Sequence, residues 1–303
     1  MCGRYTLKTP AEQIEALLHA ELALGRARDD EGDESPAGIA TAALPARYNI
    51  APTQRAPVVA ANYKPEGGPP HIDLFHWGLI PSWAKDASIA SRLINARSET
   101  LAEKPAFRRA YQQRRCLVLA DGFYEWQKLG AGDPTRPASP DEKRLDERRS
   151  DKKRPAKQAW HFRLRDGALF AFAGLWERWR DGDGDEIASF TVITTEANRL
   201  LVDKHHRMPV ILPPATWRRW LDTTISQPAD LQPLLVPYDP QAMEAWPVSS
   251  RVNSAAFDDA ACVEPIGAGD GEEPAPANAA PQAVGRATRA VAVDPRQGGL
   301  FEG

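Results

Sequence analysis

Apolar residues occur along this chain mostly in short runs, the pattern of β-strands, and at helical spacing in only a few stretches. The runs are irregularly spaced and do not alternate strictly with helices. This pattern predicts an α+β fold rather than a doubly wound parallel sheet. The predicted strands are Val58–Val59, Ile72–Trp77, Cys116–Ala120, Ala168–Ala173 and Phe190–Thr195.

A first helix is expected to begin near Thr9. The segment Thr9-Pro10-Ala11-Glu12 offers a capping residue, a proline at the first helical position and a glutamate at the third. Ile14, Leu17 and Leu18 then form one apolar stripe, as an amphipathic helix requires. Further helical stretches are predicted at Ala106–Gln113, Glu196–Val202 and Ala215–Leu221.

Two segments interrupt this pattern, and a third ends it. Residues 25–43 are rich in Asp, Glu, Gly and Ala, which predicts a solvated loop insertion. Residues 130–157 begin proline-rich and then interleave acidic with basic side chains, which favours a second solvated loop over a DNA-binding arm. Ala, Pro and Gly dominate from about residue 267. We therefore expect one domain over residues 2–265 and a disordered tail over residues 266–303.

Charge and cysteine content limit the class of protein. The 303 residues carry 38 basic and 41 acidic side chains, so the chain is not basic throughout, although a local basic groove remains compatible with DNA binding. No apolar run is long enough to span a membrane, and the N-terminus lacks a signal-peptide stretch, which predicts a cytoplasmic protein without a membrane partner. Three distant cysteines indicate neither a disulfide framework nor a zinc ribbon. We expect no metal and no cofactor, so that side chains alone carry the chemistry, and we expect a monomer.

Cys2 is distinctive because of its position. A small residue at position two usually allows removal of Met1, which leaves a free α-amine and a thiol on adjacent carbons. Such a 1,2-aminothiol reacts with aldehydes: the amine forms a Schiff base and the thiol closes onto the same carbon to give a thiazolidine. The amine has a reference pKa of about 8 and the thiol about 8.5, so both are partly reactive near neutral pH. Position alone does not establish this role, since many proteins carry cysteine there.

Other polar residues suit the same chemistry. Asn95 and Arg97 lie two residues apart and would share a face of a strand, where an amide can hold the terminal amine or a sugar hydroxyl and a guanidinium can hold a phosphate. Glu125 follows an apolar strand and is expected at the mouth of the core as a general acid with a raised pKa. Both patterns also have an ordinary interpretation: Asn95 and Arg97 could be incidental polar residues of a surface strand, and Glu125 could be a glutamate paired with arginine. Of the adjacent His205 and His206, one is expected to act as a proton shuttle and the other to be exposed.

Six ordered motifs make the chain resemble the SRAP family, the SOS-response-associated peptidase-like proteins that crosslink to abasic sites. A seventh short match is Val252-Asn253-Ser254, and one departure is His206, where the family more often has aspartate. The six motifs are Met1–Tyr5, Tyr48–Thr53, Trp77–Trp83, Ile94–Thr100, Asp121–Trp126 and His205–Pro209. The resemblance implies a single SRAP-type domain with a mixed or antiparallel barrel-like β core and flanking helices.

The resemblance also implies roles. The amine and thiol of Cys2 would form a thiazolidine with the sugar aldehyde of an abasic site in single-stranded DNA. Asn95 would position the N-terminus, Glu125 would assist ring opening and proton transfer, and His205 would help the same steps and their reversal. Trp83 could stack beside the lesion or pack in the core. The candidate DNA contacts are Arg4, Trp83, Arg97, Ser98 and Arg207.

Two other functions fit the same residues. A thiol peptidase would use Cys2, His205 and Glu125 as nucleophile, base and orienting group, with the Met1–Cys2 bond as one substrate. A non-covalent reader of modified or single-stranded DNA would need no nucleophile. Separately, Gln297-Gly298-Gly299-Leu300-Phe301 resembles a peptide that docks on the bacterial sliding clamp, which predicts a clamp contact through Gln297, Leu300 and Phe301.

Overall fold

The computed structural model describes residues 2–22, 26–28, 34–36, 44–61, 63, 70–129 and 157–266. Its centre is a closed five-stranded barrel in the order β12-β6-β5-β8-β11, and the β11–β12 pairing closes the ring. All pairs in the ring are antiparallel except the parallel pair β12–β6, so the barrel is mixed. The barrel strands are β5 (Arg55–Ala60), β6 (His71–Trp77), β8 (Arg115–Ala120), β11 (Phe170–Arg180) and β12 (Glu186–Glu196).

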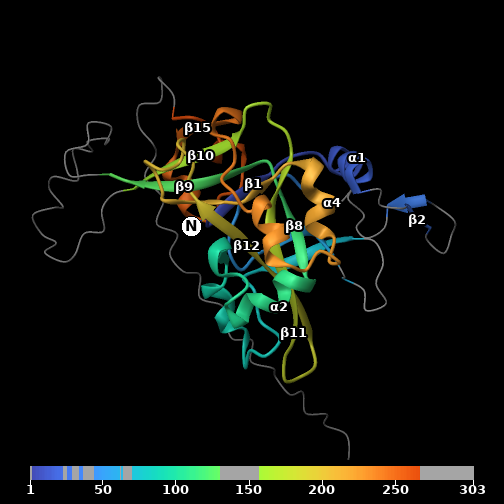
Figure 1. Cartoon of the computed structure of the whole chain (residues 1–303). Coiled ribbons are helices and arrows are strands. Elements are labelled where there is room, and N and C mark those ends of the chain that lie inside the picture. Colours follow the sequence, from blue (N-terminus) through green and yellow to red (C-terminus); the bar gives the residue numbers. More distant parts are fainter. Residues whose placement is uncertain are drawn as a thin grey trace, which may run out of the picture. The chain divides into compact units, whose positions relative to one another are not determined.

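A second sheet of five strands, in the order β15-β10-β9-β1-β4, packs beside the barrel (Figure 1). Its strands are β1 (Arg4–Leu7), β4 (Arg47–Ile50), β9 (Gly122–Lys128), β10 (Lys157–Leu164) and β15 (Met243–Val248). Aromatic side chains join the two layers: Tyr5 of β1 meets Trp77 of β6 edge to face at 5.1 Å and Phe172 of β11 at 5.8 Å between ring centroids. The core therefore fills the barrel and continues into the space under this sheet.

Short strands extend the barrel sheet. β7 (Asn95–Arg97) and β13 (Arg207–Pro209) both pair with β12, and β14 (Ile211–Leu212) pairs with β11. Within the predicted insertion at 25–43, β2 (Arg26–Arg28) and β3 (Glu34–Pro36) form a two-stranded antiparallel ribbon, an element that the composition did not predict.

Helices cover the outside of the sheets. The α-helices are α1 (Ala11–Leu22), α2 (Pro105–Gln113), α4 (Trp217–Leu221) and α5 (Pro228–Leu231). The 3₁₀ helices are η2 (Ala87–Arg92), η3 (Ser98–Thr100), η4 (Pro214–Thr216), η5 (Gln232–Leu234), η6 (Pro240–Ala242), η7 (Ser250–Asn253) and η8 (Ala260–Cys262). Helix α4 covers one side of β8, where Trp220 Nε1 donates to the carbonyl of Cys116 at 2.9 Å, and every residue of β8 is buried (Figure 1).

These observations confirm the predicted α+β class and barrel-like β core. They also confirm the first helix, whose apolar stripe buries Ile14 and Leu18. The helix predicted at Glu196–Val202 is wrong: Glu196 ends β12, and the chain then makes a series of turns. The Asn198 side chain explains the difference, since its Oδ1 accepts from the backbone N–H groups of Leu200 and Leu201 and so competes with regular helical bonding.

None of the helices among the described residues is long and apolar enough to cross a membrane.

Candidate active site

The N-terminal segment is held by strand pairing on both sides. β1 lies between β4 and β9, and Cys2 stands two residues before it, with a fully buried side chain. The Cys2 thiol donates to the carbonyl of Arg4 at 3.7 Å. Burial raises the pKa of this thiol, and the charge of Glu125 raises it further. The sulfur is therefore protonated at neutral pH and needs a nearby base to become a nucleophile.

Asn95 contacts Cys2 directly, although the two residues are 93 positions apart. Asn95 is the first residue of β7, and its Nδ2 donates to the Cys2 carbonyl at 2.8 Å. The preceding residue is fixed as well, because Trp77 Nε1 donates to the carbonyl of Ile94 at 2.9 Å. Asn95 Oδ1 is buried and has no hydrogen-bond partner among the described residues. An acceptor is thus available beside the start of the chain.

Glu125 lies in the middle of β9, opposite Trp160 of β10, and is 2% exposed. Because burial penalises the charged carboxylate, the pKa of Glu125 rises to about 7. A carboxyl group with this pKa exists in both forms at neutral pH and can give or take a proton. The position agrees with the prediction of a carboxyl group at the edge of the core.

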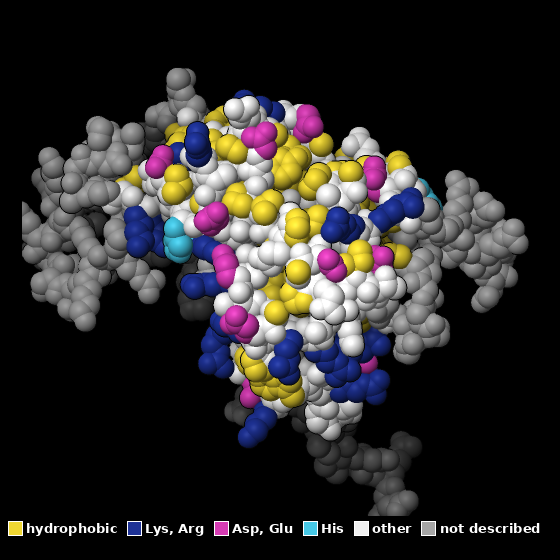
Figure 2. All heavy atoms as spheres, viewed as in Figure 1, with side chains coloured by type: hydrophobic (Ala, Val, Ile, Leu, Met, Phe, Trp, Pro, Cys, Tyr) yellow, Lys and Arg dark blue, Asp and Glu magenta, His cyan; other side chains and the backbone are white. Residues whose placement is uncertain are grey.

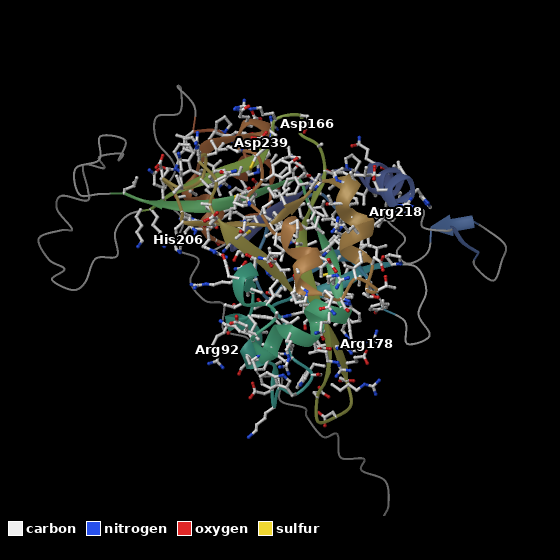
Figure 3. The ribbon with its side chains drawn as sticks, viewed as in Figure 1. Arg92, Asp166, Arg178, His206, Arg218 and Asp239 are labelled. Atoms are coloured by element: carbon white, nitrogen blue, oxygen red, sulfur yellow. The ribbon has the colours of Figure 1, made fainter. Side chains whose placement is uncertain are left out.

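His205 completes the cluster. Its Nδ1 lies 4.0 Å from Glu125 Oε2 and 3.1 Å from both the backbone N and the carbonyl O of Arg207. Burial lowers the pKa of His205 to about 4. Between about pH 4 and pH 7, therefore, Glu125 is mostly protonated and the imidazole of His205 is neutral. His206 stacks on His205 with ring centroids 4.5 Å apart but is exposed, as expected for one of the two (Figure 3).

Two of the candidate DNA contacts are exposed. Trp83 is 60% exposed, so the alternative of core packing is excluded, while stacking on a base stays a prediction. Its loop starts at Gly78, where φ is +130° and a side chain would meet the carbonyl of Ala90 at 2.6 Å. Only glycine suits that conformation. The Arg97 side chain is also exposed, with no hydrogen bond or ion pair to any described residue.

The other three candidates are engaged with the protein itself. Arg4 donates to Asn49 Oδ1 at 2.8 Å and to the carbonyls of Val252 and Asn253 at 2.6 and 3.0 Å. Ser98 is buried. Arg207 forms a two-pronged ion pair with Glu99, at 2.5 and 3.0 Å. In this conformation the guanidinium groups of Arg4 and Arg207 hold protein segments in place.

Asn49 is a supporting residue that received no role from the sequence. Its Nδ2 donates to the carbonyls of Val252, Ser254 and Phe257, at 3.2, 3.0 and 2.7 Å. Through Arg4 and Asn49, the segment around η7 is therefore tied to β1 and β4. The sequence did contain a signal for this contact, because Asn49 lies in the motif 48–53 and two of its partners lie in the short match 252–254.

Comparison with known proteins finds a matching family and named relatives. Residues 1–255 match the profile described as SOS response associated peptidase (SRAP). The chain is 37% identical over 254 residues to a protein named abasic site processing protein YoqW from Bacillus subtilis, covering 84% of this chain and 95% of that one. It is 30% identical over 233 residues to abasic site processing protein HMCES from Rattus norvegicus, covering 72% and 64% respectively.

A solved structure shares the fold. A crystal structure of a protein from Bacteroides thetaiotaomicron superimposes with a TM-score of 0.64 at 25% identity, and the match covers 87% of this chain and 99% of that one.

Proposed function

Since the chain belongs to the SOS response associated peptidase (SRAP) family, we propose that it processes abasic sites in DNA, by binding them in single-stranded DNA and forming a covalent thiazolidine through Cys2 after removal of Met1. The names of its relatives support the abasic site as substrate. The observation that carries the mechanism is the 2.8 Å hydrogen bond from Asn95 to the Cys2 carbonyl. It holds the first residue of the processed chain beside the buried Glu125.

Reaction begins with opening of the sugar. An abasic deoxyribose exists mostly as a closed hemiacetal, and its aldehyde carbon becomes available only when the ring opens. Glu125 is the acid for this step, because its pKa of about 7 keeps a large protonated fraction at neutral pH. The Cys2 amine then attacks the aldehyde carbon, and water leaves to give an imine.

The second bond comes from sulfur. Ring opening is proton-neutral overall: Glu125 protonates the ring oxygen, and the hemiacetal O–H proton passes to His205, which returns it to the hydroxide that leaves as water when the protonated imine forms. Glu125, now ionised, then accepts the proton of the Cys2 thiol as that thiol adds to the imine carbon. The net reaction joins an aldehyde and an aminothiol and releases one water. His205, neutral at this pH, lies 4.0 Å from Glu125 and relays protons to it. Ring closure removes the imine, which otherwise promotes β-elimination and strand breakage.

The strand itself is held outside this cluster. We assign Trp83 as a stacking surface for a base and Arg97 as a phosphate contact, because both side chains are exposed. Figure 2 shows further Lys and Arg side chains flanking the exposed His206, which Figure 3 labels. Asp and Glu side chains lie among them, so the phosphate contact is assigned to the exposed Arg97 and not to a continuous positive surface.

Intact mass spectrometry after incubation with abasic single-stranded DNA tests the proposal. We expect an adduct that survives denaturation, with the mass of protein plus DNA minus one water. Cys2→Ser and Cys2→Ala should abolish the stable adduct, and so should any tag left before Cys2, because it blocks the amine. A heat-stable adduct formed by Cys2→Ala would refute the thiazolidine.

Two competing functions give different results in the same experiment. A thiol peptidase needs only the sulfur, so blocking the amine would leave its activity intact, whereas the crosslinker loses all reactivity. A non-covalent reader would bind in a salt-reversible way and show no mass increase after denaturation.

A contact with the sliding clamp through Gln297, Leu300 and Phe301 remains a prediction, since these residues lie outside the described part of the chain. Removal of residues 297–303 should abolish clamp binding if the motif is used, and unchanged binding would end the idea.

A further inference from the structure

Lys204 lies beside the candidate active site with its charge unpaired. It directly precedes His205, and the backbone N–H groups of both residues donate to the carbonyl of Leu201, at 2.8 and 2.9 Å. The Lys204 ammonium lies over the Trp160 ring, 4.6 Å from the ring centroid. This side chain is half-buried and makes no hydrogen bond or ion pair with any described residue. A partly desolvated cation without a carboxylate beside it can take an external anion.

The Trp160 ring has a fixed place on the same face of the sheet as Glu125. Trp160 of β10 is directly opposite Glu125 of β9, and residues opposite one another in antiparallel strands project to the same face. Its Nε1 donates to Gln127 Oε1 at 2.9 Å, which fixes the orientation of the ring. Because Glu125 Oε2 lies 4.0 Å from His205 Nδ1, the ring supports Lys204 at the edge of this cluster.

Arg97 and Lys204 approach the cluster from opposite sides of β12. Thr194 of β12 pairs with Arg97, the last residue of β7, and also with Pro209 of β13, so β7 and β13 lie along opposite edges of that strand. Lys204 belongs to the turns that lead into β13. An abasic sugar in a strand carries one phosphodiester on its 5′ side and one on its 3′ side, so the two cations have the arrangement needed to bind both.

We propose that Lys204 binds the phosphodiester on one side of the abasic sugar and that Arg97 binds the phosphodiester on the other side. Trp160 is a positioning residue, because it holds the Lys204 ammonium without contacting the DNA. The inference rests on the proposed function, with abasic DNA as the ligand of this site. Two phosphate contacts that flank the sugar fix its position relative to Cys2.

Binding is measured with single-stranded DNA that carries a tetrahydrofuran in place of the abasic sugar, because this analogue has no aldehyde and cannot form the covalent bond. Lys204→Gln should weaken binding about tenfold and reduce the slope of log affinity against log salt by about 0.7, the contribution of one phosphate contact. Lys204→Arg should keep most of both. Arg180→Gln is the control and should change neither, since the exposed Arg180 pairs with Glu186 at the opposite end of β12, roughly 30 Å along the strand.

A neutral methylphosphonate at a single position of the DNA identifies the phosphate that each cation binds. In the unmodified protein, this replacement on either side of the tetrahydrofuran should weaken binding. Lys204→Gln should be insensitive to the replacement on one side, and Arg97→Gln should be insensitive to the replacement on the other, because each variant has already lost that contact.

Trp160→Leu tests the positioning role, because it exchanges one neutral side chain for another. It should nevertheless reduce the salt slope, whereas Trp160→Phe, which keeps a ring under the ammonium, should retain most of it. Thermal unfolding of each variant detects any loss of folded protein. If Trp160→Leu does not fold, Trp160→Phe and the two Lys204 variants still test the contact.

Three results would overturn the inference. The first is an unchanged salt slope in Lys204→Gln, and the second is full sensitivity of that variant to both methylphosphonates. The third is weaker binding by Trp160→Leu with an unchanged salt slope, which would mean that the ring stacks directly on a base. A normal Lys204 contact without any adduct on abasic DNA would refute the crosslink alone, whereas no binding to the tetrahydrofuran strand by the unmodified protein would refute both.

Discussion

Replacement of Glu125 by glutamine should make the protein more stable at pH 8 while it slows the reaction. Burial raises the pKa of Glu125 from 4.5 to about 7, so the folded state holds this proton more tightly than the unfolded chain does. The stabilising contribution of Glu125 is thus fully present below pH 4.5 and is lost as pH rises from 4.5 through 7. With about 1.4 kcal/mol for each pKa unit, the loss approaches about 3 kcal/mol at pH 8.

Glutamine has nearly the same shape and never ionises, so Glu125→Gln removes this loss. Thermal unfolding at pH 8 should occur roughly 5–10 °C higher than in the unmodified protein, and at pH 5 the difference should shrink below about 3 °C. Adduct formation should fall sharply at both pH values. The exposed Glu103 supplies the control, since Glu103→Gln should leave unfolding unchanged. A stability gain of equal size at pH 5 and pH 8 would refute the reasoning, because it would not arise from ionisation.

Three further variants test a close contact, a buried histidine and the exposed Trp83. Gly122→Ala should destabilise the fold by about 1–3 kcal/mol in a denaturation assay, because the new methyl group would meet His161 and, at 2.8 Å, Thr6 Oγ1. Gly182→Ala is the control: a methyl group there meets nothing within 4 Å and should leave stability unchanged. Equal effects of the two variants would contradict the packing argument. Burial lowers the pKa of His161 to about 3, so the contribution of neutral His161 to stability should decline as pH falls below 6.5. His161→Phe should flatten that decline in thermal melts. An equally steep decline in the variant would assign it to other groups. Trp83→Ala should melt like the unmodified protein but bind single-stranded DNA with a loss of about 1–3 kcal/mol, measured by fluorescence anisotropy, and unchanged affinity would remove Trp83 from the interface.

The apolar pattern predicted the five barrel strands, because burial on both faces leaves a continuous apolar run, as in β8, but it predicted none of the five strands of the second sheet. It underestimated β11, which continues past the apolar Phe170–Ala173 segment to Arg180. The later part of that strand mixes charged and aromatic residues, and its pairing with β12 in a hairpin keeps it extended. Local periodicity does not contain that information, and it also missed the effect of Asn198 on the turns that precede His205.

For the site, sequence motifs identified the residue types but not their partners. The buried position of Glu125 followed from the apolar strand before it. By contrast, the engagement of Arg4 with Asn49 and of Arg207 with Glu99 depends on contacts between residues 45 and 108 positions apart. An arginine in an ordered motif has the same sequence signature whether it binds a phosphate or a carboxylate, so only the three-dimensional arrangement distinguishes the two.

The proposed reaction uses a chain terminus as the nucleophile, which requires that the terminus does not fray. The first residues of most domains are poorly ordered unless paired or packed. Here β1 is an inner strand, hydrogen-bonded to both β4 and β9, and Tyr5 is fully buried against the barrel. Only two residues separate Tyr5 from Cys2, and Asn95 binds the Cys2 carbonyl from the other layer. This segment is therefore ordered during folding, so in the proposed reaction the amine and thiol of Cys2 would lose little conformational freedom when they meet the aldehyde.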